Sequence, residues 1–338
     1  MTVVLLGGVA PAQANVWQRA VEGNAIEASR ASYARALQTG DEHAGRAHAK
    51  MISPKEQLRQ IDLAVTAYRE AAAARPTEGE PYARIATVLD YFFTCSRYSR
   101  ASGEPPWSPW CGDKVIFQKV APEVIRAWEE LEKRAPLDPR FTSIPGTGSG
   151  LLFERAIMRT KLATRPQLEA AAQDYELIIR RSDRSPGESV IGNLAETYMM
   201  IGKLDEAIET YKLAIKTSNS SSTSYGLAVA LDRDGQSNQA GAIIRELGPD
   251  RVRDFELSIK LGETFFVPDG EALYYRGLIN EVLGNDANAL VHWKGFIQSG
   301  AHPQFQARAR QHVDAITRRL ANKPTLRRDE MDWDEEIP

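Results

Sequence analysis

The chain has 338 residues, of which 43% are hydrophobic and 26% charged, and its formal net charge is −3. This length suits either two domains or one extended repeat array. The small net charge gives no support for nucleic-acid binding, which usually requires a basic patch or stripe. No apolar run reaches the roughly 18–20 residues that a membrane-spanning helix needs, so we expect no membrane span.

The N-terminus, MTVVLLGGVAPAQAN, has a short apolar core followed by the small-x-small triplet AQA. This pattern predicts a secretory signal peptide over residues 1–14 that is cleaved before Asn15. The usual positive charge near the start is missing, since the first basic residue is Arg19. We expect a periplasmic or otherwise extracytoplasmic location and a helical segment over residues 15–40. A cytoplasmic protein with an unprocessed N-terminus is the alternative.

Both cysteines, Cys95 and Cys111, lie in the segment CSRYSRASGEPPWSPWC. An even cysteine count in an exported protein favours a disulfide, and two unpaired thiols are the alternative. Their spacing does not fit a CxxC redox or zinc-ribbon motif, and no histidine lies nearby, so we expect no metal. Prolines and glycines exclude a helix here. Trp107 and Trp110 either pack against the fold or anchor a partner in a binding loop.

One ordered pattern recurs along the chain: a small or aliphatic residue, a large residue four positions later, and a small or apolar residue three positions after that. This spacing places all three side chains on one face of a helix. The six occurrences are Ala64-Tyr68-Ala71, Val124-Trp128-Leu131, Ala171-Tyr175-Ile178, Ala207-Tyr211-Ala214, Ala240-Ile244-Leu247 and Ala289-Trp293-Phe296.

The pattern resembles the tetratricopeptide repeat (TPR) family, whose unit is a helix–turn–helix of about 34 residues. The best match is residues 188–221, where Gly202 falls at the turn, and residues 55–93 and 270–303 also match well. The resemblance implies an all-α, TPR-type α-solenoid of about six helix–turn–helix units over residues 41–303.

Three segments depart from the repeat spacing and are predicted to be irregular insertions: residues 94–117, 136–150 and 249–269. Within the third we expect a short helix followed by an extended stretch, Thr264–Pro268, whose apolar residues Phe265, Phe266 and Val267 pack between neighbouring repeats.

Two further elements follow the array. Residues 304–322 are predicted to form a capping helix, which repeat arrays need to cover their last apolar face. Residues 323–338 form an acidic tail, for which disorder is expected. A short docking motif around Trp333 is the alternative.

No catalytic motif stands out: HExxH, GxSxG and Walker sequences are missing from the chain. We therefore expect no enzyme activity, no catalytic residue and no cofactor.

The TPR resemblance implies that the first helices of successive units line a concave groove. The side chains placed there by repeat position are Arg84, Thr87, Asp90, Asn193, Glu196, Met199, Tyr225, Val229, Asp232, Tyr274, Leu278 and Glu281. Some TPR proteins hold a C-terminal carboxylate with Lys and Asn, but of that set only Asn193 is present. A mixed apolar and acidic groove instead suits a peptide or helix with apolar anchors and some Lys or Arg.

The TPR resemblance thus implies a non-catalytic protein–protein interaction scaffold, and by analogy with that family we expect it in an envelope-associated assembly. The alternative is an enzyme or small-ligand-binding protein whose pocket is formed by the insertions at 95–111 and 249–270.

Overall fold

The computed structural model describes residues 12–49, 51–96, 108–141, 150–182, 187–217, 220–261, 264 and 266–322. Within these ranges all regular elements are helical, so the all-α prediction is confirmed. The predictions for Trp107, for the tail 323–338 and for most of the signal peptide 1–14 lie outside the described residues.

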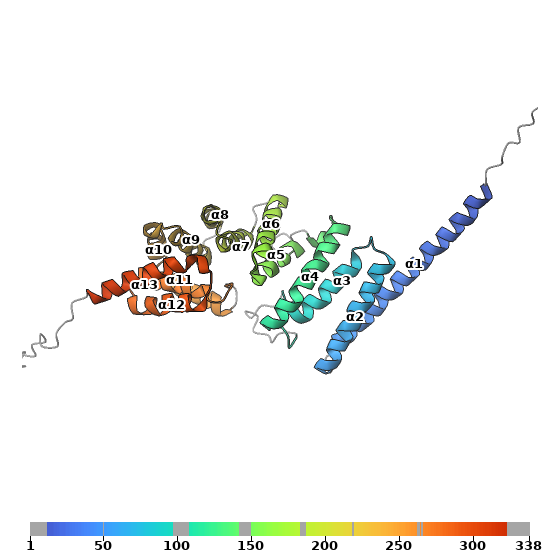
Figure 1. The fold of residues 1–338 in the computed structure, drawn as a ribbon, viewed down its shortest axis with the longest axis horizontal. Coiled ribbons are helices and arrows are strands. Elements are labelled where there is room, and N and C mark those ends of the chain that lie inside the picture. Colours follow the sequence, from blue (N-terminus) through green and yellow to red (C-terminus); the bar gives the residue numbers. More distant parts are fainter. Residues whose placement is uncertain are drawn as a thin grey trace, which may run out of the picture. The chain divides into compact units, whose positions relative to one another are not determined.

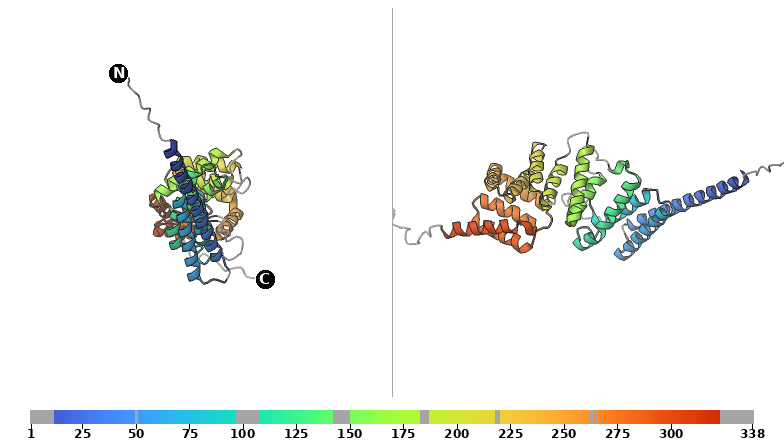
Figure 2. Two further views of the ribbon diagram at one scale, coloured as in Figure 1. Left: turned by 90° about the vertical axis from the view of Figure 1, so that its right-hand side faces the viewer. Right: turned by 45° about the horizontal axis from the view of Figure 1, so that its top comes forward.

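The chain divides into two compact units. The first contains α1 (Ala12–Ala47), α2 (Pro54–Ala74), α3 (Glu80–Leu89), the π-helical turn η1 (Asp90–Thr94), α4 (Lys114–Arg134) and the 3-10 turn η3 (Pro139–Phe141). Helix α2 packs along the C-terminal part of α1, and α3 packs against α4 (Figures 1 and 2). Consecutive helices are therefore paired.

Two predicted boundaries in the first unit were wrong. Helix α1 runs to Ala47, so the segment predicted at 15–40 and the predicted start of the array at 41 belong to one continuous helix. Helix α4 begins at Lys114, inside the predicted insertion 94–117. The cause is Asp113, whose carboxylate accepts hydrogen bonds from the backbone nitrogens of Val115 and Ile116 and thereby caps the helix.

The second unit contains α5 (Leu151–Leu162), α6 (Arg165–Arg181), α7 (Glu188–Met200), α8 (Leu204–Thr217), α9 (Ser221–Arg233), α10 (Ser237–Leu261), α11 (Glu271–Val282), α12 (Asp286–Ser299), the 3-10 turn η4 (Pro303–Phe305) and α13 (Gln306–Ala321). Helices α5 to α12 form four successive pairs, and α13 packs on α12 (Figure 1). The turns within the last three pairs contain Gly202, Gly235 and Gly284, whose φ angles of 84°, 83° and 81° favour glycine.

The recurring sequence pattern marks the buried face of the second helix in all six pairs. Every residue of the six triplets is less than 9% exposed except Leu247, which is half-buried. Close helix contacts require glycine opposite three of the large residues, and the first is Tyr68, whose ring would lie 2.3 Å from a Cβ on Gly40. A Cβ on Gly226 would lie 2.5 Å from the Tyr211 ring, and one on Gly277 would lie 2.7 Å from the Trp293 ring. The pattern therefore marks the residues through which the two helices of each pair pack against each other.

The predicted insertion 249–269 is helical over much of its length. Helix α10 breaks at Gly248 (φ 70°, ψ 178°) and resumes through Leu261, which gives the short helix expected there. Phe255 on this second stretch is fully buried, with its ring centroid 4.8 Å from that of Tyr225 and 5.9 Å from that of Tyr275. Phe266 follows, 4.9 Å from Tyr275. The segment thus packs onto the first helices α9 and α11.

The predicted disulfide is present in the first unit. Cys95 and Cys111 are bonded, with a Cα–Cα distance of 5.6 Å, and they link the end of the π-helical turn to the residues just before α4. Trp110 is half-buried, and its ring lies 5.2 Å from that of Phe93. Trp110 thus contacts the fold through Phe93, and its role in a binding loop stays a prediction.

Candidate functional site

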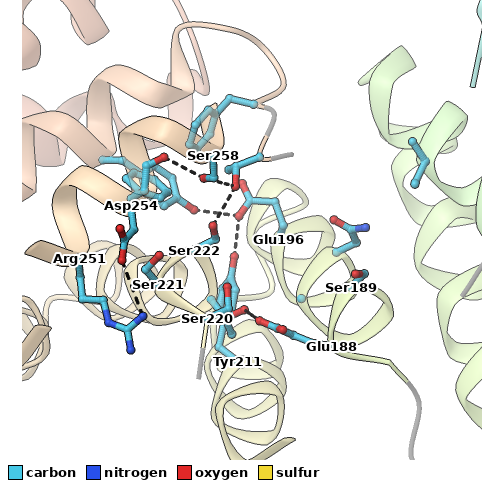
Figure 3. Close-up of a pocket in the computed structure, with 18 of the residues that line it drawn as sticks. Glu188, Ser189, Glu196, Tyr211, Ser220, Ser221, Ser222, Arg251, Asp254 and Ser258 are labelled. Atoms are coloured by element: carbon cyan, nitrogen blue, oxygen red, sulfur yellow. Dashed lines mark hydrogen bonds and ion pairs between the residues drawn. The ribbon is translucent and has the colours of Figure 1, made fainter. Parts of the chain in front are cut away.

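A cleft of about 640 Å³ lies within the second unit (Figure 3). Its walls come from α5, α7, the start of α9, the second stretch of α10 and α11. The side chains and backbone that line it belong to Phe153, Ile157, Glu188, Ser189, Gly192, Asn193, Glu196, Tyr211, Ser220, Ser221, Ser222, Thr223, Arg251, Asp254, Phe255, Ser258, Thr264, Phe266 and Tyr275. Repeat helices and the 249–269 segment therefore form the cleft together.

Glu196 is held in the cleft by two tyrosines that approach from different helices. The hydroxyls of Tyr211 on α8 and Tyr275 on α11 both donate to Glu196 Oε2, at 2.5 and 2.9 Å (Figure 3). Among the described residues no hydrogen bond reaches the other carboxylate oxygen, Oε1. The arrangement collects three oxygen atoms from three helices at one point.

Burial controls the ionisation of this group. Burial, reinforced by the nearby Glu271 carboxylate, raises the pKa of Glu196 above its ordinary value. Burial and the Glu196 carboxylate also raise the pKa values of Tyr211 and Tyr275 well above 10, so both hydroxyls stay protonated and donate.

One wall of the cleft carries many hydroxyl groups. Ser220, Ser221 and Ser222 lie at the beginning of α9 (Figure 3). Thr264 Oγ1 lies 2.8 Å from Ser222 Oγ and 2.9 Å from Ser258 Oγ. These hydrogen bonds tie the segment after α10 to α9, so they hold the wall in place.

The charged groups in the cleft are mostly acidic. Glu188 accepts a hydrogen bond from Thr223 Oγ1 at 2.9 Å, and Asp254 lies 4.0 Å from Arg251 (Figure 3). With Glu196 these make three carboxylates against one guanidinium among the described lining residues. The cleft therefore favours a cationic or hydrogen-bond-donating ligand.

The structure brings only two of the twelve predicted groove residues into this cleft, Asn193 and Glu196. A larger group is buried at no more than 3% exposure, and it comprises Met199, Tyr225, Val229, Asp232, Tyr274 and Leu278. The reason is that the second stretch of α10 and helix α13 cover the first helices that would otherwise be open.

Asp232, Tyr274 and Glu281 belong to a separate ionic network beneath α13. Asp232 accepts hydrogen bonds from Tyr274 Oη at 2.8 Å and from His312 Nε2 at 2.9 Å. Arg308 Nη2 also donates to it, at 2.7 Å. His312 Nδ1 lies 2.7 Å from Glu281 Oε2. These contacts attach α13 to α9 and α11.

The predicted groove residues of the first unit are held by local contacts. Arg84 forms an ion pair with Glu80 at 2.8 Å and another with Asp41. Thr87 Oγ1 donates to the Ala83 carbonyl oxygen at 2.8 Å. Asp90 accepts from Ser96 Oγ, also at 2.8 Å, next to the disulfide.

Sequence reasoning missed Tyr211 and Tyr275 as members of a site. The triplet pattern places Tyr211 in the helix core; its ring is buried there, while its hydroxyl reaches the cleft. The sequence signal that could have revealed Tyr275 is the consecutive pair Tyr274-Tyr275. Consecutive residues on a helix point in different directions, so the two tyrosines cannot both face the same neighbouring helix.

Three further results concern metal binding, membrane spans and similarity to known proteins. Over the described ranges no group of three His, Cys, Asp or Glu residues is placed to hold a metal ion. None of the helices in these ranges has the length and apolar character that crossing a bilayer requires. The sequence matches no protein-family model, and a search of curated proteins finds no match.

Proposed function

We propose that the chain is a TPR-type solenoid that acts as a non-catalytic scaffold and binds a peptide or helix of a partner protein in the cleft of the second unit. The observation that carries this proposal is the acidic, aromatic-lined cleft built around Glu196. It is open to a ligand, it is larger than one side chain, and its charge selects for basic partners.

The packing supports the repeat assignment. Six helix pairs each bury the same triplet on their second helix, and the turns of three consecutive pairs use glycine with positive φ. TPR-type arrays bind partners on the side formed by their first helices, and α7, α9 and α11 are first helices that border the cleft.

The disulfide supports an extracytoplasmic location, because such bonds persist in oxidising compartments. We propose an exported protein of an envelope-associated assembly. N-terminal sequencing of the protein purified from its own source should begin at Asn15, and an intact N-terminus recovered from the cytosol would contradict export.

Site-specific photo-crosslinking tests the binding function. A benzophenone amino acid is placed at Ser221 in the cleft and, as a matched control, at Glu209, whose side chain is 73% exposed on α8. In the native source, Ser221 should crosslink to a discrete protein partner that the control position does not capture. Equal crosslinking at both positions, or none at Ser221, would contradict a partner-binding cleft.

A second candidate is a small-ligand-binding protein or an enzyme, because the cleft volume lies within the range of roughly 300–1,000 Å³ typical of small-molecule sites. The 249–269 insertion forms one wall, as that alternative expected, but no described residue of 95–111 lines it. Native mass spectrometry of the purified protein separates the candidates. A retained small molecule that Ser221→Trp displaces would favour this alternative.

A further inference from the structure

The most specific feature of the cleft is the group of three oxygen atoms at Glu196, Tyr211 and Tyr275. Each tyrosine hydroxyl gives its single proton to Glu196 Oε2, so its lone pairs remain to accept a further hydrogen bond. Glu196 Oε1 has no hydrogen-bond partner among the described residues. When Glu196 is ionised, a ligand at this point therefore meets three acceptors and no donor from these groups.

Aromatic rings that pack beside Tyr275 line the same cleft. The ring centroid of Phe266 lies 4.9 Å from that of Tyr275, and Phe255 lies beneath it at 5.9 Å. Aromatic faces attract cations, and the attraction is stronger where water is displaced. An alkyl chain ending in a positive charge matches both the rings and the acceptors.

We propose that Glu196, Tyr211 and Tyr275 bind the primary ammonium group of a lysine side chain in the partner peptide. This inference rests on the proposed peptide-binding function and names the residue that the peptide presents. A lysine ammonium has three donors on one nitrogen, which match three convergent acceptors.

The same geometry disfavours arginine. A guanidinium binds carboxylates best through two parallel hydrogen bonds, one to each oxygen. Two tyrosine hydroxyls already occupy Oε2, so Glu196 offers only Oε1 for that purpose. Trimethyl-lysine has no N–H donor at all and would leave the three acceptors unpaired.

The raised pKa of Glu196 should make lysine binding depend on pH. The groups that face Glu196 are Tyr211 from α8, Arg233 from α9, Tyr275 and Glu271 from α11, and His302 after α12. Arg233 is already paired with Glu271, at 2.7 Å. A lysine ammonium is therefore the cation that would convert Glu196 to its charged form, so affinity should rise with pH as the free carboxyl loses its proton.

Peptide panels test the assignment on the full chain. Four panels of short peptides have a central lysine, arginine, norleucine or trimethyl-lysine, and their other positions are randomised among apolar residues. Binding is measured by interferometry. The lysine panel should bind about tenfold more tightly than any other, which corresponds to about 1.4 kcal/mol.

Two variants link this preference to the site. Tyr275→Phe keeps the ring and removes one acceptor, and Glu196→Gln removes the charge. Both should reduce the preference for lysine to below about threefold. The matched control is Tyr198→Phe, because Tyr198 Oη donates to Glu176 at 2.7 Å and neither residue lines the cleft. This control should leave the preference unchanged.

The other outcomes separate this inference from the proposed function. Equal binding of all panels, abolished by Ser221→Trp, would keep the peptide-binding function and overturn the lysine assignment. Tighter binding of trimethyl-lysine would replace the hydrogen-bonded site with an aromatic cage and also overturn it. A failure of every panel to bind would count against both proposals.

Discussion

Glu196 and Asp232 lie on the first helices of neighbouring pairs, yet their surroundings differ in one decisive respect. Asp232 is fully buried and receives hydrogen bonds from Arg308 and His312, so its pKa falls well below the ordinary value. Within the described residues, Glu196 receives hydrogen bonds only from neutral tyrosines, and burial together with the nearby Glu271 raises its pKa. A carboxylate matched by cations of its own chain stabilises the fold, whereas one without such a match can bind a cation from outside.

The largest expected effect is at the matched carboxylate. Asp232→Asn leaves Arg308 and His312 without their buried anion, and breaking a buried ion pair from one side costs about 3–5 kcal/mol. Hydrogen-exchange mass spectrometry of α13 should show strongly accelerated exchange. The exposed neighbour Asp234 provides the control, since Asp234→Asn should leave α13 protected. Equal exchange in the two variants would show that the network does not hold α13.

The pH dependence of stability should come partly from His312. Its contacts with Asp232 and Glu281 raise its pKa to about 9, although burial acts in the opposite direction. A raised histidine pKa stabilises the fold fully below the unfolded value near 6.5, and this contribution is lost as pH rises through about 9.

The wild type should therefore lose on the order of 3 kcal/mol between pH 6.5 and 9 relative to His312→Gln. Denaturant titrations of both proteins across this range provide the measurement. Parallel stability profiles would contradict a charged His312.

Two glycine substitutions compare packing at the site with ordinary helix propensity. In Gly226→Ala the new Cβ would lie 2.5 Å from the Tyr211 ring, so we expect a loss of about 1–3 kcal/mol and weaker peptide binding. In Gly192→Ala the nearest atom is Thr223 Oγ1 at 3.7 Å, so the helix should gain about 0.5–1 kcal/mol. Thermal unfolding of both variants measures the difference, and effects of the same sign would show that Gly226 does not position Tyr211.

The smallest effect is expected at Tyr225, whose buried hydroxyl has no hydrogen-bond partner within the described part of the chain. Tyr225→Phe should change the free energy of unfolding by less than about 1 kcal/mol, and the change should be toward greater stability. A marked loss of stability in urea denaturation would indicate that this hydroxyl makes a hydrogen bond, as the hydroxyl of Tyr275 does.

Much of the fold followed from sequence because helix packing depends on local spacing. The six triplets identified the buried face of the second helices, and Gly202 marked the turn of the best-matching pair. The site was harder to predict, because it depends on which surfaces become covered. Nothing in the repeat pattern indicates that Phe255 would pack over Tyr225, or that His312 would reach Asp232 across a separation of 80 residues.

The break in α10 at Gly248 has a consequence for engineering. One contiguous segment, residues 249–269, supplies a complete wall of the cleft, while the helix pairs on either side retain their own buried triplets. The binding preference can therefore be altered by changing residues within this one segment. Exchanging its cleft-lining polar positions, such as Arg251, Asp254 and Ser258, would change the shape and charge presented to a ligand, while Phe255 stays packed against Tyr225 and Tyr275.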